Sequence, residues 1–274
     1  MERKLTTTLL ALAASVAMAQ FAINFRDQDD NLAASGPGGG SLSRKVAGNI
    51  SLVLKGTASA KAKISSKSQG LTIAAGSITA EIVPAANQRR SRIQTAKATN
   101  GVEIDKDVLL NGARESTEIR AASATYASGS AEGRLDLAGS VSIRNVNEAR
   151  KQTSVVTGTN GVVLVDPDAA GNTAVRTATL SGPVRVNVVE EAMANRAASN
   201  FTATGDRLVY QNTAKPATIT LTGDVRIVGT GPNMIDTQGV TRATIFLNER
   251  GEMTEYELSG DPTTTTYRKG GSGS

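Results

Sequence analysis

A short phrase recurs along this chain: leucine, any residue, glycine, any residue and then, in most copies, valine, all within a run where apolar and polar residues alternate. Full copies occupy residues 137–143, 180–186 (where proline precedes the valine) and 221–227, and a shortened copy occupies 258–261. Their glycines are 43, 41 and 37 residues apart. Self-similarity at this period is typical of stacked supersecondary units. The repeat therefore argues against a single catalytic globule.

Alternation with a period of two continues outside the repeat, for example at 50–54 and 78–82. Each apolar-polar run is short and ends near Gly, Asn, Asp or Ser, which is the pattern of strands and turns. We expect an all-β fold of repeated hairpins with roughly 16 to 22 strands. Pro183 interrupts the second copy of the repeat and predicts an edge strand or a bulge at that point.

Within each copy the glycine shares its parity with the apolar residues, so an unbulged strand would place it on the apolar face. Glycine in the middle of a strand normally marks a bend, a bulge or a close approach. One interpretation is a bend that lets the sheet curl over its own core. The other is that the missing side chains leave space for a guest between two sheets, and the two interpretations are compatible.

The N-terminus has the pattern of a secretory signal peptide at residues 1–19. A basic-leaning start is followed by an apolar stretch and by Ala17-Met18-Ala19, a small-residue cleavage site. We expect export and cleavage, with an uncleaved membrane anchor as the alternative. Residues 20–43 are rich in Gly and Ser and predict a flexible linker or arm, with a short strand as an alternative where Phe21, Ile23 and Phe25 alternate. Residues 269–274 predict a flexible tail. The β-repeat domain is then expected at 44–268.

Composition excludes several classes of site. The chain has no His, no Cys and no Trp, so the usual ligands of zinc and copper and the usual general base of hydrolases are missing. The carboxylate pairs Asp166/Asp168 and Glu190/Glu191 are typical of a turn and of a strand end. The run at 27–30 lacks the spacing of a calcium loop. We expect a protein that is not an enzyme and needs no metal or cofactor. A net charge of +5 spread over 274 residues does not indicate nucleic-acid binding.

The hairpins resemble the OstA-like repeat family of periplasmic lipopolysaccharide-transport proteins, which includes LptA, the LptC ectodomain and the LptD N-terminal domain. The resemblance is best at Thr-Gly-Asp-Arg-Leu-Val-Tyr (204–210) followed by Leu-Thr-Gly-Asp-Val-Arg-Ile (221–227). It covers about residues 121–261, roughly half of the chain. The chain departs from a minimal bridging protein in its length, in its Gly-rich start and at Pro183.

The resemblance implies a twisted, V-shaped β-jellyroll whose interior accepts the acyl chains of lipopolysaccharide or a related glycolipid. It also implies periplasmic location and edge-strand pairing with other OstA-like jellyroll proteins, with inner-membrane and outer-membrane components, or end to end with further copies of itself. Exposed Arg185, Arg226 and Arg242 are then expected to meet phosphorylated sugars. Alternation alone selects the side chains expected to line the groove. These are Leu135, Leu137, Gly139, Val141, Ile143, Leu180, Gly182, Val184, Val186, Leu208, Tyr210, Ile219, Leu221, Gly223, Val225, Ile227, Ile245, Leu247 and Leu258.

Two other classes of protein share parts of this pattern. A structural envelope or surface β-repeat scaffold would show the same signal peptide, alternation and lack of cysteine, but its interior would be filled. A secreted carbohydrate-active β-helix would need paired carboxylates on one face, and the acidic pairs of this chain do not meet that requirement.

Overall fold

A computed structural model describes residues 23–26, 32–44, 48–66, 71–84, 91–110, 113–129, 132–165, 175–194, 197–213, 216–230, 233–247, 253–260 and 264–269. The predicted signal peptide, the acidic run at 27–30, the Asp166/Asp168 pair and residues 270–274 of the predicted tail lie outside this part of the chain.

The all-β prediction is confirmed, because the described residues form eighteen strands and one short 3₁₀ helix, η1 (Glu148–Arg150). The strands are β1 (Ile23–Arg26), β2 (Leu32–Gly36), β3 (Gly40–Arg44), β4 (Ile50–Lys55), β5 (Ala62–Ser66), β6 (Leu71–Ala75), β7 (Ser77–Val83), β8 (Arg92–Leu110), β9 (Ala113–Ser128), β10 (Gly133–Asn147), β11 (Gln152–Val165), β12 (Val175–Glu190), β13 (Ser199–Gln211), β14 (Ala217–Thr230), β15 (Asn233–Gln238), β16 (Val240–Leu247), β17 (Met253–Ser259) and β18 (Thr264–Lys269). No described helix has the length and apolarity needed to cross a membrane.

Strands β8 to β14 form the centre of the molecule as an antiparallel meander, each pairing with the next. They are 13 to 19 residues long, and the pairing register shifts near the middle of every one. Such shifts are β-bulges, which bend a strand and increase its twist. The bulges of neighbouring strands align, and we call the line they form the hinge. The motif residue Gly139 lies on it.

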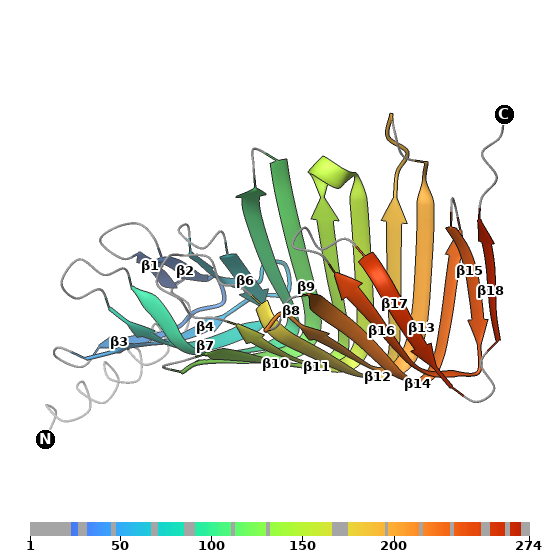
Figure 1. Cartoon of the computed structure of the whole chain (residues 1–274). Coiled ribbons are helices and arrows are strands. Elements are labelled where there is room, and N and C mark those ends of the chain that lie inside the picture. Colours follow the sequence, from blue (N-terminus) through green and yellow to red (C-terminus); the bar gives the residue numbers. More distant parts are fainter. Residues whose placement is uncertain are drawn as a thin grey trace, which may run out of the picture.

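The hinge divides the sheet into two leaves that diverge as a V (Figure 1). Leaf A contains β3, β4, β7, β16 and β17 together with one half of each central strand. Leaf B contains β1, β2, β5, β6, β15 and β18 together with the other halves. The faces of the two leaves that look toward each other are the inner face. The fold is thus the V-shaped jellyroll of repeated hairpins that the resemblance implies.

Burial on the inner face changes along the molecule. In the N-terminal strands the inward side chains are almost completely buried from the hinge outward, including Leu52, Leu54, Ile64, Ile78 and Ile82. From β9 onward the side chains beside the hinge are buried to a similar degree, as are Ala203 and Ile227 one step beyond it. Other side chains one step farther out are half-buried, among them Tyr126, Leu135, Ile143 and Ile219. The two leaves therefore pack against each other at the N-terminal end and separate toward the other end.

Two local features clarify the sequence expectations. The segment 20–43, expected as a flexible arm, contains β1, β2 and β3, and Leu32 and Ala34 of β2 are buried in the core. Its glycines mislead because they make the tight turn between β2 and β3 rather than a linker. Pro183, which lies in a central strand, occupies the bulge between Ser181 and Val184. Its missing N–H therefore removes no ladder hydrogen bond.

Candidate functional site

The inner face is an apolar surface in two bands that follow the hinge. Most residues that alternation assigns to a groove lie on it, in positions set by the strand register. The first group is buried, beside the hinge or against neighbouring strands, and consists of Leu137, Val141, Leu180, Val184, Val186, Leu208, Leu221, Val225, Ile227 and Ile245. Those that remain half-buried are Leu135, Ile143, Tyr210, Ile219, Leu247 and Leu258. The second group is the part of the predicted set that an apolar guest would contact first.

The three motif glycines lie elsewhere. Gly139, Gly182 and Gly223 have positive φ values of 76°, 89° and 104° and form the hinge itself. A Cβ on each would meet the exposed residue of the neighbouring strand, Ala122 in the case of Gly139. Parity counting placed them inward because it assumed an unbulged strand. The bulge turns the glycine outward while keeping the leucine before it and the valine after it inward.

Several inward apolar residues lie outside the predicted set because they do not belong to the repeated phrase. They are half-buried and pack against the core at Ile119, Tyr126, Val156, Val165, Ala178, Val188, Phe201 and Ile235. Alternation marks some of these strands, but only the register aligns them with the motif strands. Ile143, for example, pairs with Ile119 on one side and with Val156 on the other.

The inner face of leaf B becomes polar farther from the hinge. We call this band the polar shelf, and it consists of Lys106, Glu115, Thr117, Asn145, Asn147, Gln152, Ser154, Glu190 and Ser199. The register aligns these residues across β8 to β13, and all are half-buried. They have the parity of inward residues such as Ile143 and Val186. Leaf A has no such band in its described residues of the same region, where Leu135, Tyr210 and Ile219 stand instead.

Hydrogen bonds connect the shelf residues in two groups. Asn145 Nδ2 donates to Glu115 Oε1 and to Thr117 Oγ1, both at 3.0 Å. Glu190 accepts from Gln152 Nε2 at 2.9 Å and from Ser199 Oγ at 3.0 Å. Glu190, one of the acidic pair noted in the sequence, is thus held by its neighbours at the end of β12. These bonds fix the side chains in place on the inner face.

Burial affects two ionisable groups on the inner face. Burial lowers the pKa of Lys106, and nearby Glu115 acts in the opposite direction. Burial raises the pKa of the Tyr210 phenol above its ordinary value. Both shifts indicate a face that is only partly hydrated, as desolvation disfavours the charged form.

The arginines expected to meet phosphorylated sugars lie on the outer faces. Arg185, Arg226 and Arg242 are exposed and have the opposite parity to their inward neighbours. Arg226 Nε lies 3.5 Å from Asp236 Oδ1. They are therefore separated by the sheet from the apolar inner face. No group of three or more potential metal ligands was found in the described part of the chain.

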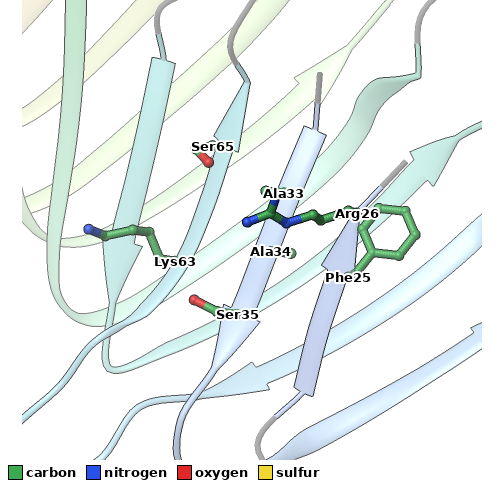
Figure 2. A pocket seen from close by; sticks show the side chains of 7 residues that line it. All are labelled: Phe25, Arg26, Ala33, Ala34, Ser35, Lys63 and Ser65. Atoms are coloured by element: carbon green, nitrogen blue, oxygen red, sulfur yellow. The ribbon is translucent and has the colours of Figure 1, made fainter. Parts of the chain in front are cut away.

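A hollow of about 430 Å³ lies on the outer face of β1, β2 and β5 (Figure 2). Arg26 and Lys63 flank it on either side of β2, and Ser35 and Ser65 contribute hydroxyls. It is shallow, and it lies on the opposite side of leaf B from the apolar bands. It is therefore separate from the candidate site.

No family model, no curated protein and no solved structure matches this chain. The inner face and the polar shelf are therefore the basis for any conclusion about function.

Proposed function

We propose that this protein is an exported, non-enzymatic carrier that binds the acyl chains of lipopolysaccharide, or of a related glycolipid, between its two leaves and passes them toward the outer membrane. The observation that carries the proposal is the band of half-buried apolar side chains on the inner face. Ile143, Phe201 and Ile219 belong to it, and they lie beyond a hinge that is already fully packed.

The physical reason is the cost of hydrating an acyl chain. Each methylene removed from water contributes about 0.8 kcal/mol, so a chain leaving a membrane needs a continuous apolar path. The rows of Val, Ile and Leu along the hinge supply such a path without any chemistry. Resemblance of the hairpins to lipopolysaccharide-transport proteins supports the same ligand, and the signal-peptide pattern supports a periplasmic location.

The experiment that tests the proposal compares two adjacent valines. Val188 is half-buried on the inner face, whereas its neighbour Val189 is 38% exposed and points outward. Native mass spectrometry of the mature chain from a lipopolysaccharide-producing host should show a bound species of lipopolysaccharide or lipid A mass. Val188→Asp should remove that species and Val189→Asp should keep it. A protein that is bare and that also fails to take up added lipopolysaccharide would contradict the proposal.

Partners are proposed to join at the ends of the leaves. Within the described residues β3 and β17 each pair with one strand only, as do β1 and β18. Open edges are templates for pairing with another strand. The side chain of Leu42 in β3 is 45% exposed, so Leu42→Lys should weaken association with a second jellyroll, or with another copy, in sedimentation experiments.

A structural envelope scaffold is the second candidate. The packed N-terminal end favours it, because the inward side chains of Leu52, Leu54 and Ile78 have no exposed surface. The same mass spectrum separates the two candidates, since a scaffold would bind no lipid. N-terminal sequencing of the exported protein tests the remaining part of the proposal, with Gln20 as the expected first residue.

A further inference from the structure

The polar shelf gives the inner face two unlike walls. Near the hinge both leaves are apolar, and leaf A stays apolar farther out through Leu135, Tyr210 and Ile219. On leaf B the side chains change from Ile143 to Asn145 within two residues, which corresponds to about 7 Å along a strand. A molecule lying against this surface would meet apolar groups along the hinge and on leaf A, and polar groups in two rows of leaf B. The row nearer the hinge continues into the apolar side chains Val188 and Phe201.

Three side chains of the shelf, Asn145, Gln152 and Glu115, offer hydrogen-bond acceptors, whereas Asn147 accepts from the Arg150 N–H through its Oδ1. Both bonds of the Asn145 amide use its nitrogen, and no group in the described residues donates to its Oδ1. The same is true of Gln152 Oε1, because Gln152 is bonded through Nε2. Glu115 accepts through Oε1, and its second oxygen remains available among the described residues. These half-buried oxygens can accept from water or from the donors of a ligand that displaces it.

The charges point to the same kind of ligand. Lys106 is the one cation of the shelf, and Glu115 and Glu190 are its two carboxylates. Glu115 interacts with Lys106 closely enough to favour its charged form. The cation is therefore opposed from within the shelf, and the shelf as a whole does not favour a second anion such as a phosphate.

From these observations we infer that the polar shelf binds an uncharged, hydroxyl-rich sugar head group, whose attached acyl chains extend from the shelf to the hinge. This inference rests on the proposed carrier function and narrows it to glycolipids whose sugar, rather than phosphate, lies between the leaves. Sugar hydroxyls donate to the oxygens of Asn145, Gln152 and Glu115. Any phosphate group of the same lipid remains in solvent beyond the rim.

The test uses three amphiphiles with one alkyl chain and different heads: dodecyl maltoside, dodecyl phosphate and dodecylamine. Each is titrated below its micelle concentration into the mature full-length chain by calorimetry. We expect dodecyl maltoside to bind about tenfold more tightly than dodecyl phosphate, the effect of one or two net hydrogen bonds. Asn145→Leu and Gln152→Leu should bring the two affinities within about twofold of each other, because the acceptors are lost while the apolar surface remains.

Asn187→Leu is the matched control, because Asn187 accepts from Thr202 Oγ1 at 3.1 Å on the outer face of the same leaf. It should leave the preference unchanged. Glu115→Gln keeps the size of its side chain and serves if the leucine variants do not fold, and it should reduce the preference for maltoside.

Each other outcome has a definite meaning. Equal binding of the maltoside and the phosphate, or tighter binding of the phosphate, overturns the sugar assignment and leaves the carrier function standing. Tight binding of dodecylamine in place of the maltoside also overturns it, because the donor would then be an ammonium. Failure of all three amphiphiles to bind contradicts the carrier function itself.

Discussion

Some glycines of this protein are required by the backbone conformation, whereas others only leave a small space. The φ angle and the atoms that a Cβ would meet distinguish the two kinds. Gly139 lies at the hinge with a φ of 76°, and a Cβ there would stand 2.7 Å from the Cβ of Ala122. Gly161, which lies in the same sheet, faces inward, and a Cβ there would meet Leu137 Cδ1 at an ordinary 3.5 Å. The first glycine is required by the backbone, whereas the second only leaves a small space.

We therefore expect Gly139→Ala to lower the free energy of unfolding by about 1–3 kcal/mol, the cost of holding a side chain in a sparsely populated conformation. Gly161→Ala should change it by less than about 1 kcal/mol, because its conformation suits alanine. Urea unfolding followed by circular dichroism measures both. Equal losses in the two variants would show that the bend does not depend on glycine.

Tyr210 reports the hydration of the inner face through its pKa. Burial raises that pKa in the folded state above the ordinary value of 10.0. Stability from the neutral phenol is therefore fully present below pH 10 and is lost as the pH rises through the higher folded value. The ultraviolet titration of the wild type minus that of Tyr210→Phe should show one tyrosine ionising above pH 10.

Binding of a lipid should move this titration still higher, because an acyl chain displaces the remaining water from the phenol. A Tyr210 that titrates at its ordinary value, with or without lipid, would argue against a poorly hydrated inner face.

At the scale of the strand, the bulge allows one strand to serve two leaves. Residues 217–222 of β14 pair with β16, and Val228 and Gly229 pair with β15. Few backbone pairs join β14 to β15, so a side chain adds to them. Thr237 is completely buried, and its Oγ1 accepts from the backbone N–H of Ile227 at 2.9 Å.

Thr237→Val keeps the shape of the side chain but leaves the Ile227 N–H without its acceptor. We expect a loss of about 1–3 kcal/mol in the free energy of unfolding, the cost of an unsatisfied buried donor. Thr241→Val is the control, because its hydroxyl donates to the Ser259 carbonyl at the surface, and it should cost less than about 0.5 kcal/mol. Thermal unfolding of the two variants compares them, and a neutral Thr237→Val would show that the backbone pairs suffice.

For the whole molecule, the packing of the two leaves is graded from one end to the other. Leu52 in β4 and Ala80 in β7 have almost no exposed surface. Tyr126 and Leu135, which continue the same row of paired residues in later strands, are half-buried. Local opening requires less free energy where fewer apolar contacts hold the structure.

Hydrogen exchange should follow this gradient. Amides of β4 and β7 are expected to exchange most slowly and those of the edge strands β3 and β17 fastest, as measured by mass spectrometry of the native protein. Addition of lipopolysaccharide should slow exchange in β10 to β14 and leave β4 and β7 unchanged. Lipid-induced protection confined to β4 and β7 would place the ligand at the wrong end of the molecule.

The strand content and the apolar face of this protein could be predicted from the sequence, because both depend on local alternation with a period of two. The position of the hinge followed from the repeated glycine, a residue whose conformational freedom is a local property. Leu221 and Val225, which the alternation assigns to the apolar face, are buried.

Only the tertiary structure decided which half of each strand belongs to which leaf, since that depends on pairing between residues far apart in the chain. The bulge turns the motif glycines outward, and the odd-even alternation of residue numbers cannot reveal it. The tertiary structure also places residues 32–44 in the core and at the edge of the sheet. It also aligned Lys106, Asn145 and Gln152 into one shelf, although they lie on three strands and share no motif. The alternation within a short segment is enough to predict a strand. The pairing register between strands cannot be predicted in the same way, because it depends on many contacts between residues far apart in the chain, and no single contact is recognisable in the sequence.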